Sequence, residues 1–148
     1  MKKTKKSLMI VSMVTSLLVV LSIGTFAWQV DFYIESESNN VLADADSIPF
    51  GHGKVAVGVV TSSDQYDWYK IQPTSTDFDA SLDVPKSADI DMVLFDENGK
   101  VISTEGATSG FGNDEKIKDV RVDTSKTYYI RVQHFRGTMD QPYMLDTY

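Results

Sequence analysis

The chain has 148 residues, enough for one domain, with 14 basic and 21 acidic residues and a formal net charge of −7. Without the four lysines of the first six positions, the balance is 10 against 21, or −11; so acidic a body argues against nucleic acid and anionic membranes as partners. The absence of Cys excludes disulfides, thiolate metal sites and a Cys-linked lipid anchor.

The N-terminus has the pattern of a secretory signal. A basic stretch, Lys2–Lys6, is followed by an apolar run, Leu8–Ile23, and by small residues at Thr25 and Ala27. We expect cleavage after Ala27 and a secreted, extracellular product. The alternative is a retained anchor, but the run reaches about 20 apolar residues only if it includes Gly24 through Trp28.

The rest of the chain is predicted to be all-β. Residues 28–47 are interpreted as an N-terminal linker and residues 48–148 as a domain with period-two apolar patterning. About eight strands at even spacing favour an antiparallel β-sandwich or jelly roll. The predicted strands are Lys54–Thr61, Tyr66–Gln72, Phe78–Val84, Ile90–Asp96, Val101–Glu105, Lys116–Val122, Thr127–Phe135 and Pro142–Thr147. Asn98-Gly99 predicts a hairpin turn.

Alternation along the predicted strands assigns side chains to the core or to the outer face. Tyr69 and Ile71 are expected to point inward, which leaves Trp68 pointing outward. The same argument places Phe78, Ala80, Leu82 and Val84, and also Tyr128, Ile130 and Val132, in the core. Asp89 and Asp91 are expected to face solvent, since Ile90, Met92 and Leu94 point inward.

Four stretches in order resemble the bacterial pre-peptidase C-terminal domain family, to which the collagen-binding domains of clostridial collagenases are similar. They are Glu35-Ser-Glu37-Ser-Asn39-Asn40; Gly58 with Asp64-Gln-Tyr-Asp67-Trp68-Tyr69; Asp89-Ile-Asp91-Met-Val-Leu-Phe-Asp96 with Asn98-Gly99; and Tyr128-Tyr129-Ile-Arg-Val132 with Tyr143-Met-Leu145. The resemblance spans residues 35–148 and implies a small β-sandwich. Such domains usually accompany a secreted peptidase, whereas here the domain follows the signal almost directly.

Oxygen-bearing side chains gather in the linker and after the first core strand, and such ligands suit calcium better than zinc or copper. On their own they are interpreted as solvated surface charge, because acidic runs in linkers usually are. The resemblance implies a calcium site formed by Glu35, Glu37, Asn39, Asn40, Asp64 and Asp67, which match the family's ligand positions. Asn40 replaces a frequent Asp of the family and removes one charge.

No catalytic motif is recognisable, and we expect no enzyme activity. The chain has two His, in a turn and at a strand end, and lacks a Gly-x-Ser-x-Gly elbow. We expect instead a calcium-binding module for extracellular matrix, cell wall or another polymer, with collagen as one candidate. The candidate ligand contacts are Trp68, Tyr129, Arg131 and Phe135. Two alternatives remain: a detached domain that assists a secreted peptidase, and a hydrolase of unfamiliar type.

Overall fold

A computed structural model describes residues 29–107 and 110–148, and the predicted secretory signal lies outside these ranges. Within them, no helix has the length and apolar character needed to cross a bilayer. Ten strands are formed: β1 (Asp31–Ile34), β2 (Asp46–Ile48), β3 (Lys54–Gly58), β4 (Tyr66–Ile71), β5 (Asp77–Asp83), β6 (Ala88–Phe95), β7 (Val101–Ser103), β8 (Glu115–Arg121), β9 (Tyr128–Gly137) and β10 (Tyr143–Thr147). A 3-10 turn, η1 (Leu42–Asp44), lies between β1 and β2.

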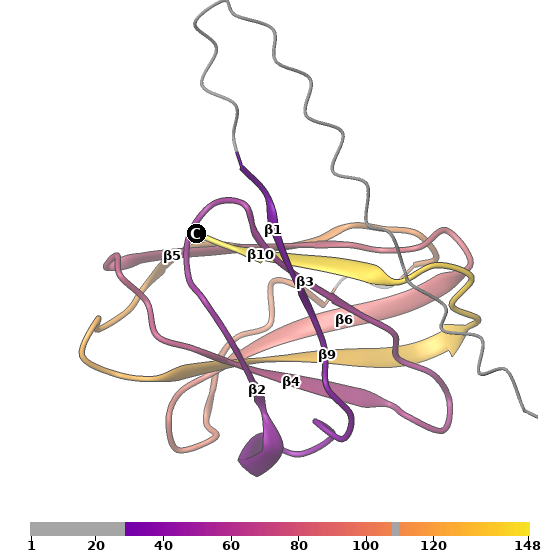
Figure 1. Cartoon of the computed structure of the whole chain (residues 1–148), viewed down its shortest axis with the longest axis horizontal. Helices are drawn as coiled ribbons and strands as arrows, with labels where there is room; N and C mark the ends of the chain where they lie inside the picture. Colours follow the sequence, from indigo (N-terminus) through magenta and orange to yellow (C-terminus); the bar gives the residue numbers. More distant parts are fainter. Residues whose placement is uncertain (1–28, 108–109) are drawn as a thin grey trace, which may run out of the picture.

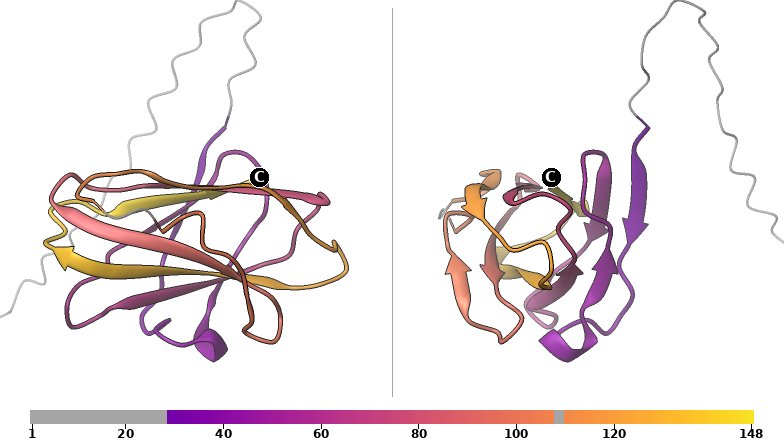
Figure 2. Two further views of the ribbon diagram at one scale, coloured as in Figure 1. Left: turned by 180° about the vertical axis from the view of Figure 1, so that it is seen from behind. Right: turned by 90° about the vertical axis from the view of Figure 1, so that its left-hand side faces the viewer.

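The strands form two five-stranded sheets that pack face to face, as Figures 1 and 2 show. Sheet A has the order β1-β3-β10-β5-β8, and sheet B has the order β2-β4-β9-β6-β7. Neighbouring strands are antiparallel except at one edge of each sheet, where β1 is parallel to β3 and β2 is parallel to β4. The predicted β-sandwich is confirmed, with ten strands in place of about eight.

Two strands were not predicted from the sequence: β1 lies within the segment interpreted as a linker, and β2 lies across its C-terminal boundary. β1 is an edge strand of sheet A and β2 is an edge strand of sheet B, so residues 31–48 cross from one sheet to the other. β1 has four residues and β2 has three, too short for a clear period-two pattern. Their parallel pairing also requires no hairpin turn that could have been recognised.

The core follows the predicted alternation. Every core residue named from the pattern is buried, including Tyr69, Ile71, Leu82 and Ile130, each with no exposed surface. These side chains come from both sheets and form a single cluster between them. The hairpin at Asn98-Gly99 is also present: Gly99 has φ +75° and donates its N–H to the carbonyl of Asp96 at 3.0 Å.

The prediction that Asp89 and Asp91 face solvent is wrong. Both are buried, as is every residue of β6. The connection from β7 to β8 runs along β6 and bonds to it: Gly106 O accepts Met92 N–H at 2.6 Å, and Gly110 N–H donates to Asp89 at 3.0 Å. Alternation gives the direction of a side chain relative to its own sheet, but it does not show that a later loop covers that face.

Replacing Ile130 by Ala should destabilise the fold by about 2–5 kcal/mol, because the change empties a fully buried position between the sheets. The matched control is Ile102→Ala, at a β7 position that is 40% exposed, where a change within about 0.5 kcal/mol is expected. The measurement is the free energy of unfolding in denaturant. Equal losses for the two variants would contradict the assignment of the core.

Candidate metal site

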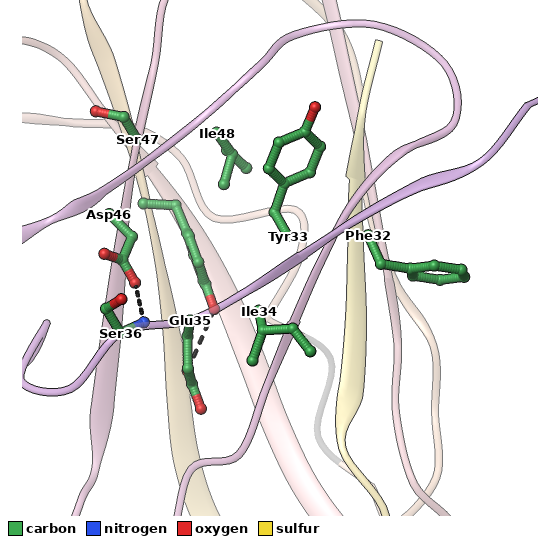
Figure 3. A pocket seen from close by; sticks show the side chains of 9 residues that line it. Phe32, Tyr33, Ile34, Glu35, Ser36, Asp46, Ser47 and Ile48 are labelled. Carbon is green, nitrogen blue, oxygen red and sulfur yellow. Dashed lines mark hydrogen bonds between the residues drawn. The ribbon is translucent and has the colours of Figure 1, made fainter. Parts of the chain in front are cut away.

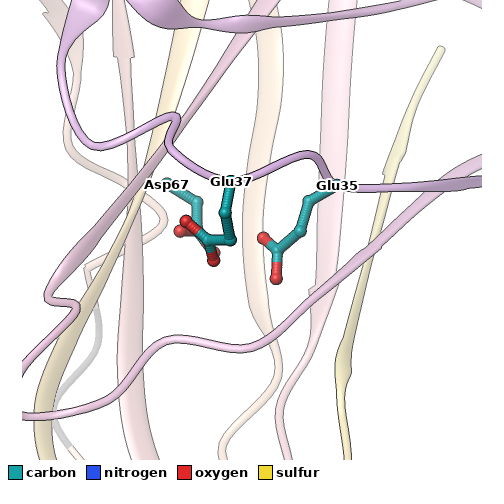
Figure 4. A group of neighbouring side chains, drawn as sticks. All are labelled: Glu35, Glu37 and Asp67. Carbon is teal, nitrogen blue, oxygen red and sulfur yellow. The ribbon is translucent and has the colours of Figure 1, made fainter.

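Three carboxylates from separate parts of the chain meet beside the crossing segment. One oxygen each of Glu35, Glu37 and Asp67 lies within 4.8 Å of the others, and Figure 4 shows the three side chains reaching toward one space. Glu35 directly follows β1, Glu37 lies in the crossing segment, and Asp67 points inward from β4. Exposure increases from Asp67, fully buried, through Glu35 to Glu37.

Hydrogen bonds from both sheets hold the two inner carboxylates. Glu35 accepts the Val59 N–H at 2.7 Å and the hydroxyls of Tyr69 and Tyr143 at 3.3 Å each. Tyr143 also donates to Asp67 at 2.5 Å, and the two tyrosine hydroxyls are 2.6 Å apart. Tyr143 belongs to sheet A and Tyr69 to sheet B, so this network joins the two sheets near the segment between β1 and β2.

Gly58 is required by this close packing. A Cβ atom at this position would lie 2.3 Å from Glu35 Oε2 and 2.3 Å from the Tyr143 hydroxyl oxygen. Both atoms belong to the network around Asp67, so a larger residue would displace the carboxylate as well as the ring. The glycine therefore allows Glu35 and Tyr143 to approach the end of β3 together.

The cluster shifts the acidity of its members. Burial, followed by the contact with the Glu35 carboxyl, raises the pKa of Asp67 to about 9, although the bond from Tyr143 acts in the opposite direction. Burial also raises the pKa of Glu37, with the neighbouring Asp64 carboxyl as the next cause and Glu35 as a further one. Without a cation, Asp67 therefore keeps its proton at neutral pH.

The remaining predicted ligands lie around the three carboxylates in different ways. Asp64 is adjacent to Glu37. Asn39 is fully buried; its backbone carbonyl accepts the Trp68 N–H at 2.9 Å. Asn40 is exposed and lines a shallow depression with Asp64.

Several buried oxygens at the site lack protein partners, as expected of a site that a cation fits. Oδ1 of Asn39, Asp64 and Asp67 is buried without a hydrogen-bond partner. A buried polar atom without a partner costs about 1–3 kcal/mol, and a bound cation would remove that cost. The donors are carboxylate and amide oxygens only, which suits a hard divalent cation with flexible coordination.

A pocket opens next to the cluster, between β1 and β2 (Figure 3). Glu35 and Tyr69 line both the pocket and the cluster, and Asp46 lies across from them. Asp46 accepts the Ser36 N–H at 2.7 Å, which fixes the start of the crossing segment. Glu35 is therefore reachable from solvent along the edge where the two short strands lie.

A second predicted site, the aromatic one, lies on the outer face of sheet B. Trp68 stands opposite Arg131, and Lys70 stands opposite Tyr129. The guanidinium of Arg131 lies over the rings of Trp68 at 5.6 Å, Tyr66 at 5.1 Å and Phe95 at 5.2 Å.

Three of the four predicted contacts, Trp68, Tyr129 and Arg131, thus come together. Phe135 lies further along β9 and is 60% exposed. Tyr66 and Phe95 were not among the predicted ligand contacts, although both side chains have the outward parity of their strands.

The two histidines have structural surroundings. His52 stacks on the ring of Tyr148, with centroids 4.2 Å apart. His134 is buried within β9, with Nε2 3.2 Å from the carbonyl oxygen of Gly137. Each imidazole is thus held by a contact with another residue of the chain.

No protein-family model matches the chain, and no curated protein matches it in sequence. Among solved structures, the pre-peptidase C-terminal domain of a collagenase from Bacillus anthracis is 18% identical over 70% of this chain and 94% of that domain, with a TM-score of 0.49. The chain is similar in structure to a pre-peptidase C-terminal domain. A β-glucosidase from Paenibacillus barengoltzii is 12% identical over 79% of this chain and 13% of that one, with a TM-score of 0.30.

Gly58→Ala should destabilise the protein by about 1–3 kcal/mol, as overpacking does, although Gly→Ala at an uncrowded site is usually stabilising. The reason is the 2.3 Å approach of Glu35 and Tyr143 to the added methyl group. The measurement is denaturant unfolding in chelator for Gly58→Ala, Glu35→Ala and the double variant. Coupling between the two changes is expected, and strictly additive effects would contradict the proposed contact.

Proposed function

We propose that this protein is an exported, non-catalytic β-sandwich module that binds calcium at the Glu35–Asp67 cluster and an extracellular polymer on sheet B. The observation that carries the calcium proposal is the convergence of Glu35, Glu37 and Asp67 within 4.8 Å. Asp64, adjacent to Glu37, supplies a fourth carboxylate. Asn39 and Asn40 complete the proposed ligand set.

Calcium fits this site better than magnesium. Calcium accepts six to eight oxygens in flexible geometry, whereas magnesium requires a close octahedral arrangement and gives up its water reluctantly. The donors come from a crossing segment and a strand, with Glu37 exposed and Asp67 buried. Calcium binding displaces the proton on Asp67, so the apparent affinity should increase with pH.

Bound calcium would stabilise the crossing segment. Residues 35–40 contribute one buried side chain, Asn39, and have little apolar surface to hold them against the sheets. A cation shared by Glu35, Glu37 and Asp67 would connect this segment to β4. The ion would then hold β1 and β2 in place, together with their backbone pairing.

The polymer-binding proposal is supported by the aromatic face of sheet B. Trp68, Tyr129 and Arg131 lie on one face of sheet B with Gln133, to which Arg131 Nη2 donates at 3.0 Å. Rings that present a face, combined with fixed polar groups, suit an extended ligand lying along the strands. Phe135 extends this surface toward the end of β9.

Calcium should raise the melting temperature, and Glu37→Gln or Asp64→Asn should reduce that rise. A ligand at 100 times its Kd stabilises the folded state by about 2.7 kcal/mol, which for a domain of this size is roughly 10 °C. The measurement is a thermal melt at pH 7.5 in chelator, in millimolar calcium and in millimolar magnesium. Asp44→Asn, an exposed carboxylate in the same segment, is the matched control and should retain the full rise. Identical wild-type melts in all three solutions would refute the site.

Trp68→Ala should reduce polymer binding more than it reduces stability. The ring is half-buried against Phe95, with centroids 4.8 Å apart, so the loss of stability should stay below the 3–5 kcal/mol of a buried Trp→Ala. The measurement is co-sedimentation with insoluble collagen, peptidoglycan and chitin, with and without calcium. Phe32→Ala removes an aromatic ring that is 61% exposed on sheet A and should leave binding intact. Equal binding by wild type and Trp68→Ala on every polymer that is bound, or binding to none, would contradict the proposal.

A further inference from the structure

One acidic side chain at the start of β2 holds the segment that carries the proposed calcium ligands. Asp46 Oδ2 accepts the Ser36 N–H at 2.7 Å (Figure 3) and an N–H of the Asn39 side-chain amide at 3.4 Å. Ser36 and Asn39 lie on either side of Glu37 in the chain. One carboxylate oxygen therefore holds the segment at two points, with a proposed ligand between them.

Asp46 is itself anchored in sheet B. It stands beside Tyr69 in the parallel register of β2 and β4, and the Tyr69 hydroxyl donates to Glu35 at 3.3 Å. The same strand, β4, carries Asp67, the buried carboxylate of the cluster. The bonds to Asp46 thus connect the crossing segment to the strand that supplies Asp67.

The Asn39 side chain is fully buried, and one end of its amide lacks a partner. Nδ2 donates to Asp46, whereas Oδ1 has no hydrogen-bond partner among the described residues. The Asn39 backbone is fixed as well, because its carbonyl accepts the N–H of Trp68, the neighbour of Asp67, at 2.9 Å. With the nitrogen end held by a carboxylate, the oxygen end is the one left for a cation, and calcium accepts amide oxygens as ligands.

We propose that Asp46 is a positioning residue of the calcium site, which orients the Asn39 amide so that Oδ1 is presented to the cation. This inference rests on the calcium site proposed above. A carboxylate oxygen accepts hydrogen bonds, so it selects the nitrogen end of the amide. Without Asp46, the amide would be free to turn over and place its N–H donors where a ligand oxygen is required. Loss of a residue that orients a metal ligand typically weakens metal binding by about tenfold to a hundredfold.

Two other roles would also make Asp46 matter for calcium binding. Its charge could attract the ion from a distance, an effect that any neutral replacement would abolish. It could also be a ligand itself, in which case its effect would not depend on Asn39. The two hydrogen bonds to Oδ2 favour positioning, because they occupy this oxygen with donors from the crossing segment. Substitutions that separate charge from hydrogen bonding, and Asp46 from Asn39, distinguish the three roles.

The test measures the calcium Kd by titration calorimetry, with thermal melts in chelator to establish that each variant folds. Asp46→Ala should bind calcium about tenfold to a hundredfold more weakly than Asp46→Asn, since both variants lack the charge and only the latter keeps an acceptor oxygen. Most of that difference should disappear in an Asn39→Ala background, because Asp46 acts through Asn39. At the exposed Asp44, the matched controls Asp44→Ala and Asp44→Asn should bind calcium equally.

Equal affinities of Asp46→Ala and Asp46→Asn would overturn the positioning role and leave the calcium site standing, whereas a wild type that binds no calcium would overturn both. An undiminished difference in the Asn39→Ala background would also refute the inference. Should Asp46→Ala fail to fold, a crystal structure of the wild type with calcium decides. Asn39 Oδ1 at about 2.3–2.6 Å from the ion, with Asp46 outside the ligand shell, supports positioning; Asp46 on the ion, or Asn39 away from it, refutes it.

Discussion

At the edge formed by β1 and β2, four acidic side chains lie beside one another: Glu35, Glu37, Asp64 and Asp67. The organisation of this edge follows from their crowding. Their mutual repulsion is opposed by donors from the protein, namely the Tyr143 hydroxyl to Asp67 and the Val59 N–H to Glu35. A proton retained on Asp67, whose pKa is raised to about 9, opposes it further. The same residues are the ones that we propose as calcium ligands.

The position of this cluster explains why the crossing segment matters to both sheets. β1 and β2 are edge strands of different sheets, and the acidic residues Glu35 and Glu37 lie between them. Two residues of inner strands approach these acids: Asp67 from β4 in sheet B and Tyr143 from β10 in sheet A. A perturbation at the cluster thus reaches the edges of both layers, whereas the aromatic face around Trp68 and Arg131 lies on the opposite surface of sheet B.

The sequence predicted the sandwich and its core because long strands repeat with period two over five to ten residues. The sequence alone could not predict that β1 and β2 pair in parallel, since short edge strands carry little pattern and parallel pairing has no local turn. The six proposed ligands are implied by the family resemblance and not by the strand pattern. Three of them, Glu35, Glu37 and Asp67, lie together in the structure. The burial of Asp91 was missed because its cover comes from a connection more than ten residues later in the chain.

The placement of β10 has a consequence for how the chain acquires its structure. β10 lies between β3 and β5, and it bonds to both. Sheet A therefore stays divided into two unconnected halves until residues 143–147 are available to fill the gap. Contacts between segments so distant in the chain make folding slow, typically milliseconds to seconds for sandwiches. Among the described strands, the one that closes sheet A is therefore also the last in the chain.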